Sequence, residues 1–352
     1  MKLNHIVFNY QKESTFINKD KYFISLYYPL IIIKYNSNNK IFTPLLFIYQ
    51  LFTLIVSWRK YSIVVSEIAS YHTFIPSILS FLKLKKHIII LHGTDSNIIP
   101  EINYGNLQKP ILKWFTSFSI KNATLLLPVS ESLIESENTF CTYKKARFGL
   151  KNIIPNLKTD YQIVYNCLDA TYFKITNFQR NPNTLLTVAV DLDKEKNFKL
   201  KGIDFILKLA QSFPQYQFSI LGSEKIFGYD NSLENVNVIG EKKQSELERY
   251  YNNHSFYLQL SNSESFGLSL CEAMLCGCIP IVSNVGMMTK IVDNDELVLK
   301  NQDTKQFLLI MENCKKLANS KCDMESRRNT VIKRFSDGIR KNQLIHIINE
   351  LN

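Results

Sequence analysis

The chain has 352 residues, of which 45% are hydrophobic and 12% aromatic, and its formal net charge is +11. This composition excludes an intrinsically disordered protein, and the length exceeds what one typical core holds, so we expect two domains of ordinary size. The seven cysteines are scattered without the paired spacing of a zinc site, which favours a reduced, cytoplasmic compartment.

The positive charge is concentrated in the first half of the chain. Residues 1–177 hold 20 Lys and Arg against 10 Asp and Glu, whereas residues 178–352 hold 22 against 21. This basic first half of the chain suits an anionic partner, either the head groups of a membrane surface or an anionic acceptor. We expect no nucleic acid partner. A compositional bias towards solvated lysines is the alternative explanation.

Two early segments bear on membranes. The opening MKLNHIVFNYQKE lacks the apolar core of a secretory signal, so none is expected. The segment from Ile41 to Trp58 is 18 residues without a charge, at the lower limit for a spanning helix. Pro44 fits a first helical turn, and Gln50 and Thr53 interrupt the apolar run. We expect a helix packed on a sheet or lying on a membrane surface rather than one that spans the bilayer.

Isoleucine-rich and valine-rich runs alternate with helical patterns along the rest of the chain. This alternation predicts parallel sheets covered on both faces. In the first half, strands are predicted at 4–10, 61–67, 86–93, 123–130 and 161–166, with a helix at 72–84. After a polar linker at 175–184, strands are predicted at 185–190, 216–222, 235–240, 256–261 and 279–284, and helices at 202–213, 245–253 and around Glu272.

The pattern predicts an α/β protein of two Rossmann-like, doubly wound domains facing across a cleft. We expect an N-terminal domain over residues 1–177, a C-terminal domain over 178–334 and a closing helix over 335–352. Ligands of such sheets bind beyond the carboxyl ends of the strands. The chemistry is therefore expected just after each strand, for example at Ser66-Glu67 or at Ser261 to Gly267.

The stretch SESFGLSLCEAMLCGCIP, from Ser263 to Pro280, places Glu264 in a polar loop and Glu272 eight residues later on an apolar helix. A carboxylate there is costly unless it has a partner. Ser263 or Ser265 is positioned to cap the helix, whose first amides would suit a phosphate, and Glu272 would suit ribose hydroxyls. Two carboxylates that are held by salt bridges explain the spacing equally well.

This stretch resembles the E-x7-E segment of the retaining GT-B glycosyltransferases of family 4, the "group 1" type. HGTD at His92, PVSES at Pro128, KGID at Lys201 and SILG ending at Gly222 follow the family's order. The similarity covers roughly residues 60 to 300, and the E-x7-E block is its most specific part.

The resemblance implies a role for each matching residue. Glu264 would contact the donor sugar, Lys201 would neutralise the diphosphate leaving group, and His92 would lie close to the sugar. Glu272 would hold the ribose of the nucleotide. The remaining donor-binding positions would be Ser265, Phe266, Gly267, Leu268 and Gly222, and Gly93 and Asp95 would lie towards the acceptor.

The sequence also departs from the family pattern. Val190 stands where the family has an arginine, and the segment DLDKEKNFKL lengthens the following loop, in which Lys194, Lys196 or Lys199 would have to substitute. Asp191 and Asp193 mimic a metal-binding Asp-x-Asp pair, but a helix with the E-x7-E pattern does not belong to that other architecture. We therefore expect neither a metal nor another cofactor.

The resemblance implies a glycosyltransferase that moves a sugar from a nucleoside diphosphate sugar to a glycan or lipid-linked acceptor with retention of configuration. The expected setting is assembly of a bacterial surface polysaccharide or glycolipid, in the cytoplasm or peripherally at the inner face of the plasma membrane. A non-catalytic nucleotide-sugar-binding scaffold and a GT-B sugar-nucleotide epimerase are the alternatives.

Overall fold

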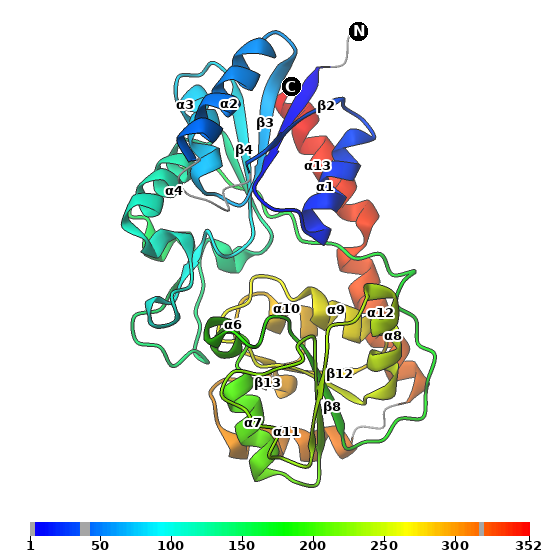
Figure 1. Cartoon of the computed structure of the whole chain (residues 1–352). Coiled ribbons are helices and arrows are strands. Elements are labelled where there is room, and N and C mark those ends of the chain that lie inside the picture. The colour runs from blue at the N-terminus through cyan, green and yellow to red at the C-terminus, as the bar shows by residue number, and fades with distance from the viewer. Residues whose placement is uncertain (1–3, 36–42, 317–319) are drawn as a thin grey trace. The chain divides into compact units, whose positions relative to one another are not determined.

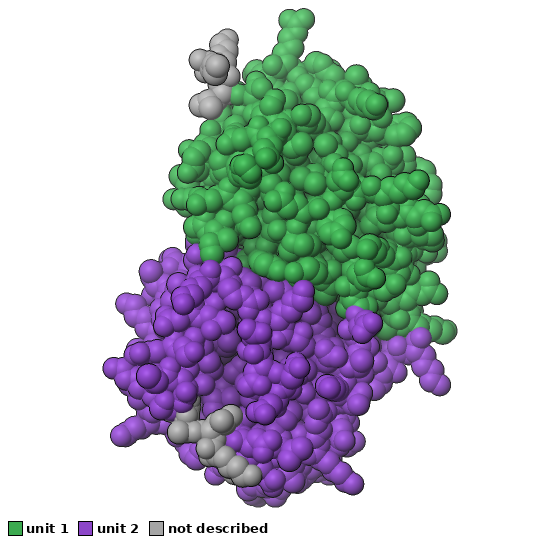
Figure 2. All heavy atoms as spheres, turned by 180° about the vertical axis from the view of Figure 1, so that it is seen from behind, with its two compact units in different colours: residues 1–136, 145–166, 338–352 green, residues 137–144, 167–337 purple. Residues whose placement is uncertain are grey.

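The computed structural model describes residues 4–35, 43–316 and 320–352, and the chain divides into two compact units. The first contains residues 1–136, 145–166 and 338–352, and the second contains residues 137–144 and 167–337 (Figure 2). The sequence had suggested boundaries after residues 177 and 334. In the structure residues 137–144 already belong to the second unit, the chain enters that unit again at Cys167, and its final helix returns to the first unit.

The first unit is built on a five-stranded parallel sheet. Its order is β2-β1-β3-β4-β6, which is the flavodoxin-like order of a doubly wound sheet, with the topological switch point between β1 and β3. The strands are β1 (His5–Tyr10), β2 (Leu30–Lys34), β3 (Tyr61–Glu67), β4 (Lys86–Leu91) and β6 (Leu125–Pro128).

Helices cover both faces of this sheet. Helices α1 (Thr15–Ser25) and α13 (Asp337–Leu351) lie on one face, and α2 (Thr43–Val56), α3 (Phe74–Phe81) and α4 (Pro110–Asn122) lie on the other (Figure 1). Shorter pieces complete the unit: η2 (Tyr71–Thr73), η3 (Pro100–Ile102), η4 (Asn106–Gln108), η5 (Glu131–Leu133), α5 (Leu150–Ile153) and the antiparallel pair β5 (Asn97–Ile98) and β7 (Arg147–Phe148).

The second unit contains a six-stranded parallel sheet in the order β10-β9-β8-β11-β12-β13. This is the order of the dinucleotide-binding Rossmann fold, and its switch point lies between β8 and β11. The strands are β8 (Thr184–Val188), β9 (Gln217–Leu221), β10 (Val236–Ile239), β11 (Phe256–Gln259), β12 (Ile279–Ser283) and β13 (Val298–Leu299).

The helices of the second unit follow the strands in the expected alternation. Both units therefore confirm the predicted doubly wound α/β architecture. The helices are α6 (Glu195–Leu200), α7 (Ile203–Ser212), α8 (Gln244–Asn253), α9 (Leu268–Leu275), α10 (Met288–Val292), η6 (Asp295–Leu297), α11 (Thr304–Lys316) and α12 (Lys321–Phe335).

Three local predictions were wrong. Residues 161–166 do not form a strand: Gln162 and Val164 donate to the carbonyls of Leu126 and Pro128 in β6, but Pro128 has no N–H with which to continue the ladder. The segment DLDKEKNFKL is not simply a longer loop, because its second half forms α6. Neither Ser263 nor Ser265 is the N-cap of the Glu272 helix, since the helix begins after Gly267.

The uncharged segment predicted as a helix at 41–58 forms α2, with Pro44 in its first turn, while residues 41 and 42 lie outside the described part of the chain. Gln50 and Leu54 are buried towards the sheet, but most of the other side chains of α2 are exposed. Among the described residues, the structure contains no helix that is long and apolar enough to cross a membrane.

Candidate active site

The loops after β8 and β11 meet at the switch point of the second sheet. Gly202, between α6 and α7, has a positive φ of 65°, and a side-chain Cβ there would lie 1.9 Å from the carbonyl oxygen of Leu260. Only glycine permits this approach, which fixes the loop after β8 against the loop after β11. The neighbouring Lys201 is thereby held beside the loop that carries Glu264.

Lys201 and Glu264, predicted separately from two motifs, form an ion pair in the structure. Lys201 Nζ lies 2.9 Å from Glu264 Oε2, and Gln259 Nε2 donates to the same oxygen at 2.9 Å. The Lys201 side chain is 33% exposed and that of Glu264 is 15% exposed. A partly exposed pair of this kind costs little to rearrange, so the ammonium group can turn to an incoming phosphate.

The backbone of the Glu264 loop is fixed from its other side. Gly286 follows β12 with a φ of 61°, and a Cβ there would lie 1.8 Å from the carbonyl oxygen of Glu264. The amide of Ser265 donates to Glu264 Oε1 at 3.2 Å. The loop therefore presents the Glu264 carboxylate in one defined position.

Glu272 lies on the second turn of α9, where its Oε2 accepts a hydrogen bond of 2.8 Å from the hydroxyl of Tyr251. Burial, and next the Glu272 carboxylate, raise the pKa of Tyr251 well above its ordinary value, so this hydroxyl is a constant donor. The pairing explains how a carboxylate is tolerated on this apolar helix.

The other predicted donor-binding positions surround the start of α9. Phe266 is buried and packs edge-on against Phe335, with 5.1 Å between ring centroids, while Gly267 occupies the N-cap with a φ of 101°. No side chain caps α9 at this position, and Leu268 opens its first turn. Gly222 lies at the end of β9, where its amide bonds to the carbonyl of Ile239.

The candidates for a metal and for the missing arginine are engaged in surface ion pairs. Asp191 pairs with Lys194 at 2.6 Å, and Lys199 pairs with Asp204 at 2.9 Å. Within the described part of the chain, no group of three or more His, Cys, Asp or Glu side chains is arranged to hold a metal ion.

In the first unit, His92 follows β4 and pairs with Glu67, which ends β3. Their Nε2 and Oε2 atoms lie 2.7 Å apart, and the His92 ring stacks on Phe16 with 4.3 Å between centroids. Burial, and next the charge of Asp20, raise the pKa of Glu67 well above its ordinary value, whereas burial and the charge of Arg340 lower that of His92. Both shifts favour a neutral acid hydrogen-bonded to a neutral imidazole.

The segment after His92 is organised by Asp95, whose side chain is fully buried. The Asp95 carboxylate accepts from the amides of Ala69, His92 and Gly93 at 2.9, 3.2 and 2.9 Å. Its oxygens are thus used to hold the loop. An acceptor-side contact of Asp95 is not supported, and the structure assigns it a positioning role beneath His92 and Gly93.

A buried ion pair connects this network to the last helix. Arg340 of α13 forms a fork with both carboxylate oxygens of Asp20 on α1, with Nε to Oδ1 at 2.6 Å, and its remaining nitrogen donates to the carbonyls of Val164 and Tyr165. The two side chains are 2% and 0% exposed. The pair fixes α13 to the first unit.

Sequence reasoning singled out Glu67 only by its position at the end of a predicted strand, which is β3 in the structure. It assigned no role to Tyr251, Gln259, Asp20 or Arg340. Gln259 contacts Glu264 five residues further on, Tyr251 contacts Glu272 across 21 residues, and Asp20 meets Arg340 across 320 residues. No local pattern reports the longest of these contacts.

Comparison with known proteins identifies the second unit. Residues 170–328 match the family model "Glycosyl transferases group 1". The second unit contains a glycosyltransferase group 1 domain. This finding supports the prediction of a transferase enzyme, and the domain contains Lys201, Glu264 and Glu272.

Two curated relatives match in sequence. An uncharacterized glycosyltransferase of Methanocaldococcus jannaschii is 24% identical over 242 residues, which are 66% of this chain and 60% of the relative. An uncharacterized 41.2 kDa protein in the cps region of Klebsiella pneumoniae is 28% identical over 120 residues, 32% of this chain and 33% of that protein. The matches thus span less than two thirds of these relatives.

Solved structures resemble the whole chain in fold. A glycosyltransferase of Rickettsia africae has a TM-score of 0.71 at 14% identity, covering 99% of this chain and 98% of its own. Sucrose-phosphate synthase of Thermosynechococcus elongatus has 0.68 at 12%, with 99% coverage of both chains, and Anabaena HepE, solved with UDP and glucose, has 0.66 at 13%, covering 98% and 99%. The likeness extends over almost the whole chain, which shows that the chain has the GT-B fold.

Proposed function

We propose that this glycosyltransferase transfers a sugar from a nucleoside diphosphate sugar to a glycan or lipid-linked acceptor, with retention of anomeric configuration, as in family 4. The observation that carries the proposal is the Lys201–Glu264 pair at the switch point of the second sheet, with Glu272 on the helix that follows. A cation for a diphosphate and two carboxylates for hydroxyl groups are what a nucleotide sugar requires.

In this proposal Lys201 leaves Glu264 and neutralises the diphosphate as the bond from the anomeric carbon to the phosphate oxygen breaks. The acceptor oxygen forms the new bond on the same face of the sugar, and its proton passes to the departing diphosphate oxygen. Glu264 binds sugar hydroxyls, and Glu272, which lies on the second turn of α9, binds the ribose. His92 keeps the contact to the sugar that the resemblance implies.

The donor and the setting are proposed from the relatives. Anabaena HepE was solved with UDP-glucose, so a uridine diphosphate sugar is the first donor to test. One relative is a protein of a cps region, which supports assembly of a surface polysaccharide or glycolipid as the setting. We also propose that the reaction requires no metal, because the Asp-x-Asp metal pair belongs to an architecture in which the helix of the E-x7-E pattern has no place.

The proposal is tested by substituting the two carboxylates separately. Glu272→Ala should weaken binding of a nucleoside diphosphate about tenfold, as expected for one lost charged hydrogen bond, with the fold intact. Glu264→Ala should lower donor turnover, measured as transfer or hydrolysis, while affinity for the nucleoside diphosphate changes little. Titration calorimetry and a product assay, both with and without EDTA, measure these effects.

Tyr251→Phe is the matched control for Glu272, because it removes the partner but keeps the carboxylate. Equal nucleotide affinity of Glu272→Ala and the unmodified protein would contradict the ribose assignment. Loss of turnover in EDTA that manganese restores would replace the metal-free mechanism with one through Asp191 and Asp193.

A further inference from the structure

Helix α2 presents an apolar face to solvent. Its 14 residues contain no charged side chain, and Ile48, Phe52 and Ile55 are 65%, 65% and 58% exposed. A surface helix of a water-soluble unit normally places polar side chains at such positions. We therefore expect the exposed side of α2 to contact a partner that shields it from water.

The apolar surface continues from α2 onto the neighbouring helices. Phe47 of α2 stacks on Phe115 of α4, with 5.9 Å between ring centroids. Helices α2, α3 and α4 lie on the same face of the first sheet (Figure 1). We define the α2–α4 face by the exposed side chains of Ile48, Phe52, Ile55, Phe81, Ile111 and Trp114. A surface of several large apolar side chains marks an interaction site.

The charges around this face are almost all positive. Residues 41–125 contain eight Lys and Arg but three acidic residues, and Glu67 and Asp95 are buried among them. Glu101 remains as the exposed acid of this segment. The cationic side chains include Lys83 and Lys113, which are exposed on the loop after α3 and on α4.

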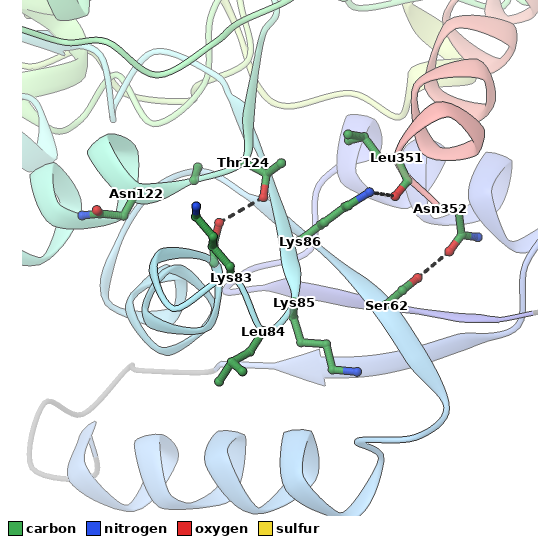
Figure 3. A pocket seen from close by; sticks show the side chains of 11 residues that line it. Ser62, Lys83, Leu84, Lys85, Lys86, Asn122, Thr124, Leu351 and Asn352 are labelled. Atoms are coloured by element: carbon green, nitrogen blue, oxygen red, sulfur yellow. Dashed lines mark hydrogen bonds between the residues drawn. The ribbon is translucent and has the colours of Figure 1, made fainter.

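A cationic pocket of about 500 Å³ adjoins the face at the end of α3. Lys83, Lys85 and Lys86 line it, and so does Leu84, whose exposed side chain points towards α2 (Figure 3). Lys85 donates to the carbonyls of Trp58 and Tyr61, at 2.7 and 2.6 Å, and Lys86 donates to the carbonyl of Leu351, whereas Lys83 is exposed at the pocket. Such a hollow suits the phosphate of a lipid head group.

We propose that the α2–α4 face docks the first unit on a membrane whose surface carries anionic lipids. The aliphatic and aromatic side chains enter the boundary between head groups and acyl chains, and the lysines contact lipid phosphates. Stable attachment of a monotopic protein requires two signals, and here these are apolar side chains that insert and basic side chains around them. A protein partner is disfavoured because a protein interface would be expected to have acidic as well as basic side chains at its rim.

This inference concerns the first unit alone and does not rest on the proposed sugar transfer. Vesicle binding without transfer would leave the docking surface standing, and transfer without vesicle binding would leave the proposed function standing. The two proposals therefore fail separately.

The first test is co-sedimentation of the full chain with phosphatidylcholine vesicles that contain or lack phosphatidylglycerol. We expect binding to the anionic vesicles, and we expect Phe52→Glu to weaken it at least about tenfold, because one inserted aromatic side chain is lost and a charge is added. The matched control is Leu309→Glu on α11 of the second unit, where Leu309 is 58% exposed, and it should bind as the unmodified protein does.

Charge is tested separately with Lys83→Gln and Lys113→Gln. Each should weaken binding about fivefold at low salt, since a lysine near an anionic surface contributes by its charge, and the loss should shrink as salt rises. Lys208→Gln, an exposed lysine on α7 of the second unit, is the control.

The depth of insertion is read from Trp114, which is 58% exposed, in a Trp58→Phe background that leaves one tryptophan. Brominated lipids should quench its fluorescence, and the emission should shift to the blue. Absence of vesicle binding, or binding that Phe52→Glu leaves unchanged, would overturn the proposal. A dimer in lipid-free solution that Phe52→Glu dissociates would assign the face to a second copy of the chain instead.

Discussion

Each unit pairs a glutamate with a nitrogen base after the strands of its sheet, but the two pairs have opposite surroundings. The side chains of Glu67 and His92 are 0% and 6% exposed, whereas those of Glu264 and Lys201 are 15% and 33% exposed. Burial penalises charge and so favours the neutral forms of Glu67 and His92, whereas solvent reaches the pair of Lys201 and Glu264. The first pair is suited to holding a position and the second to exchanging its partner for a ligand.

The two regions also differ in what supports them. The Glu67–His92 pair lies near a buried Asp20–Arg340 fork, whose charges act on both residues. The Glu264–Lys201 pair is supported by Gln259 and by backbone contacts at Gly202 and Gly286. Substitutions in the first region should therefore affect stability, and substitutions in the second should affect activity.

The largest effect is expected at Arg340. Arg340→Ala should lower the free energy of unfolding by about 3–5 kcal/mol, because it leaves the buried Asp20 carboxylate without its counter-ion. Urea unfolding measures the loss. Lys151→Ala, which removes an exposed pair with Glu135, is the control and should leave the unfolding midpoint in place. A similar small change in both variants would contradict the assigned difference between buried and exposed pairs.

The next effect is expected on the rate of sugar transfer. Lys201→Ala should lower kcat about 10²- to 10³-fold, because the leaving diphosphate loses its charged partner. The free energy of unfolding should change by no more than about 1 kcal/mol, since the pair with Glu264 is partly exposed. Lys194→Ala, at the exposed pair with Asp191, is the control for activity. Full activity of Lys201→Ala would remove the proposed role.

The smallest effect is a pH dependence of stability at Glu67. Its pKa is raised in the folded protein, so the stabilising, protonated form is complete below the ordinary value of 4.5 and is lost as pH rises through the folded value. Glu67→Gln mimics the protonated acid and escapes this loss. Relative to the unmodified protein, its stability should rise by about 1.4 kcal/mol per pH unit above 4.5, up to the folded pKa.

Urea unfolding of both proteins between acidic and neutral pH measures this difference. Glu135→Gln, at a side chain that is 71% exposed, is the matched control. Parallel stability curves for Glu67→Gln and the unmodified protein would show that Glu67 is ionised in the folded state.

The elements predicted correctly are those whose signal is local. Runs such as IVF and IVV give β1 and β3, and the apolar periodicity of residues 202–213 gives α7, because burial on a sheet face dictates those side chains. The failures have a tertiary cause. Residues 161–166 have the composition of a strand, but their partner strand β6 ends at Pro128, which has no N–H to donate, and Arg340 takes the carbonyls of Val164 and Tyr165.

By itself, the sequence determined the two doubly wound sheets and the residues after their strands, Lys201, Glu264, Glu272 and His92 among them, because a strand's composition and its end are local features. Only the tertiary structure decided which of these side chains meet and which reach solvent. Lys201 contacts Glu264 across 63 residues, Glu272 is held by Tyr251, and Asp95 is buried beneath the loop it was expected to extend from. Such contacts depend on strand order and on burial, and no periodicity along the chain encodes either one.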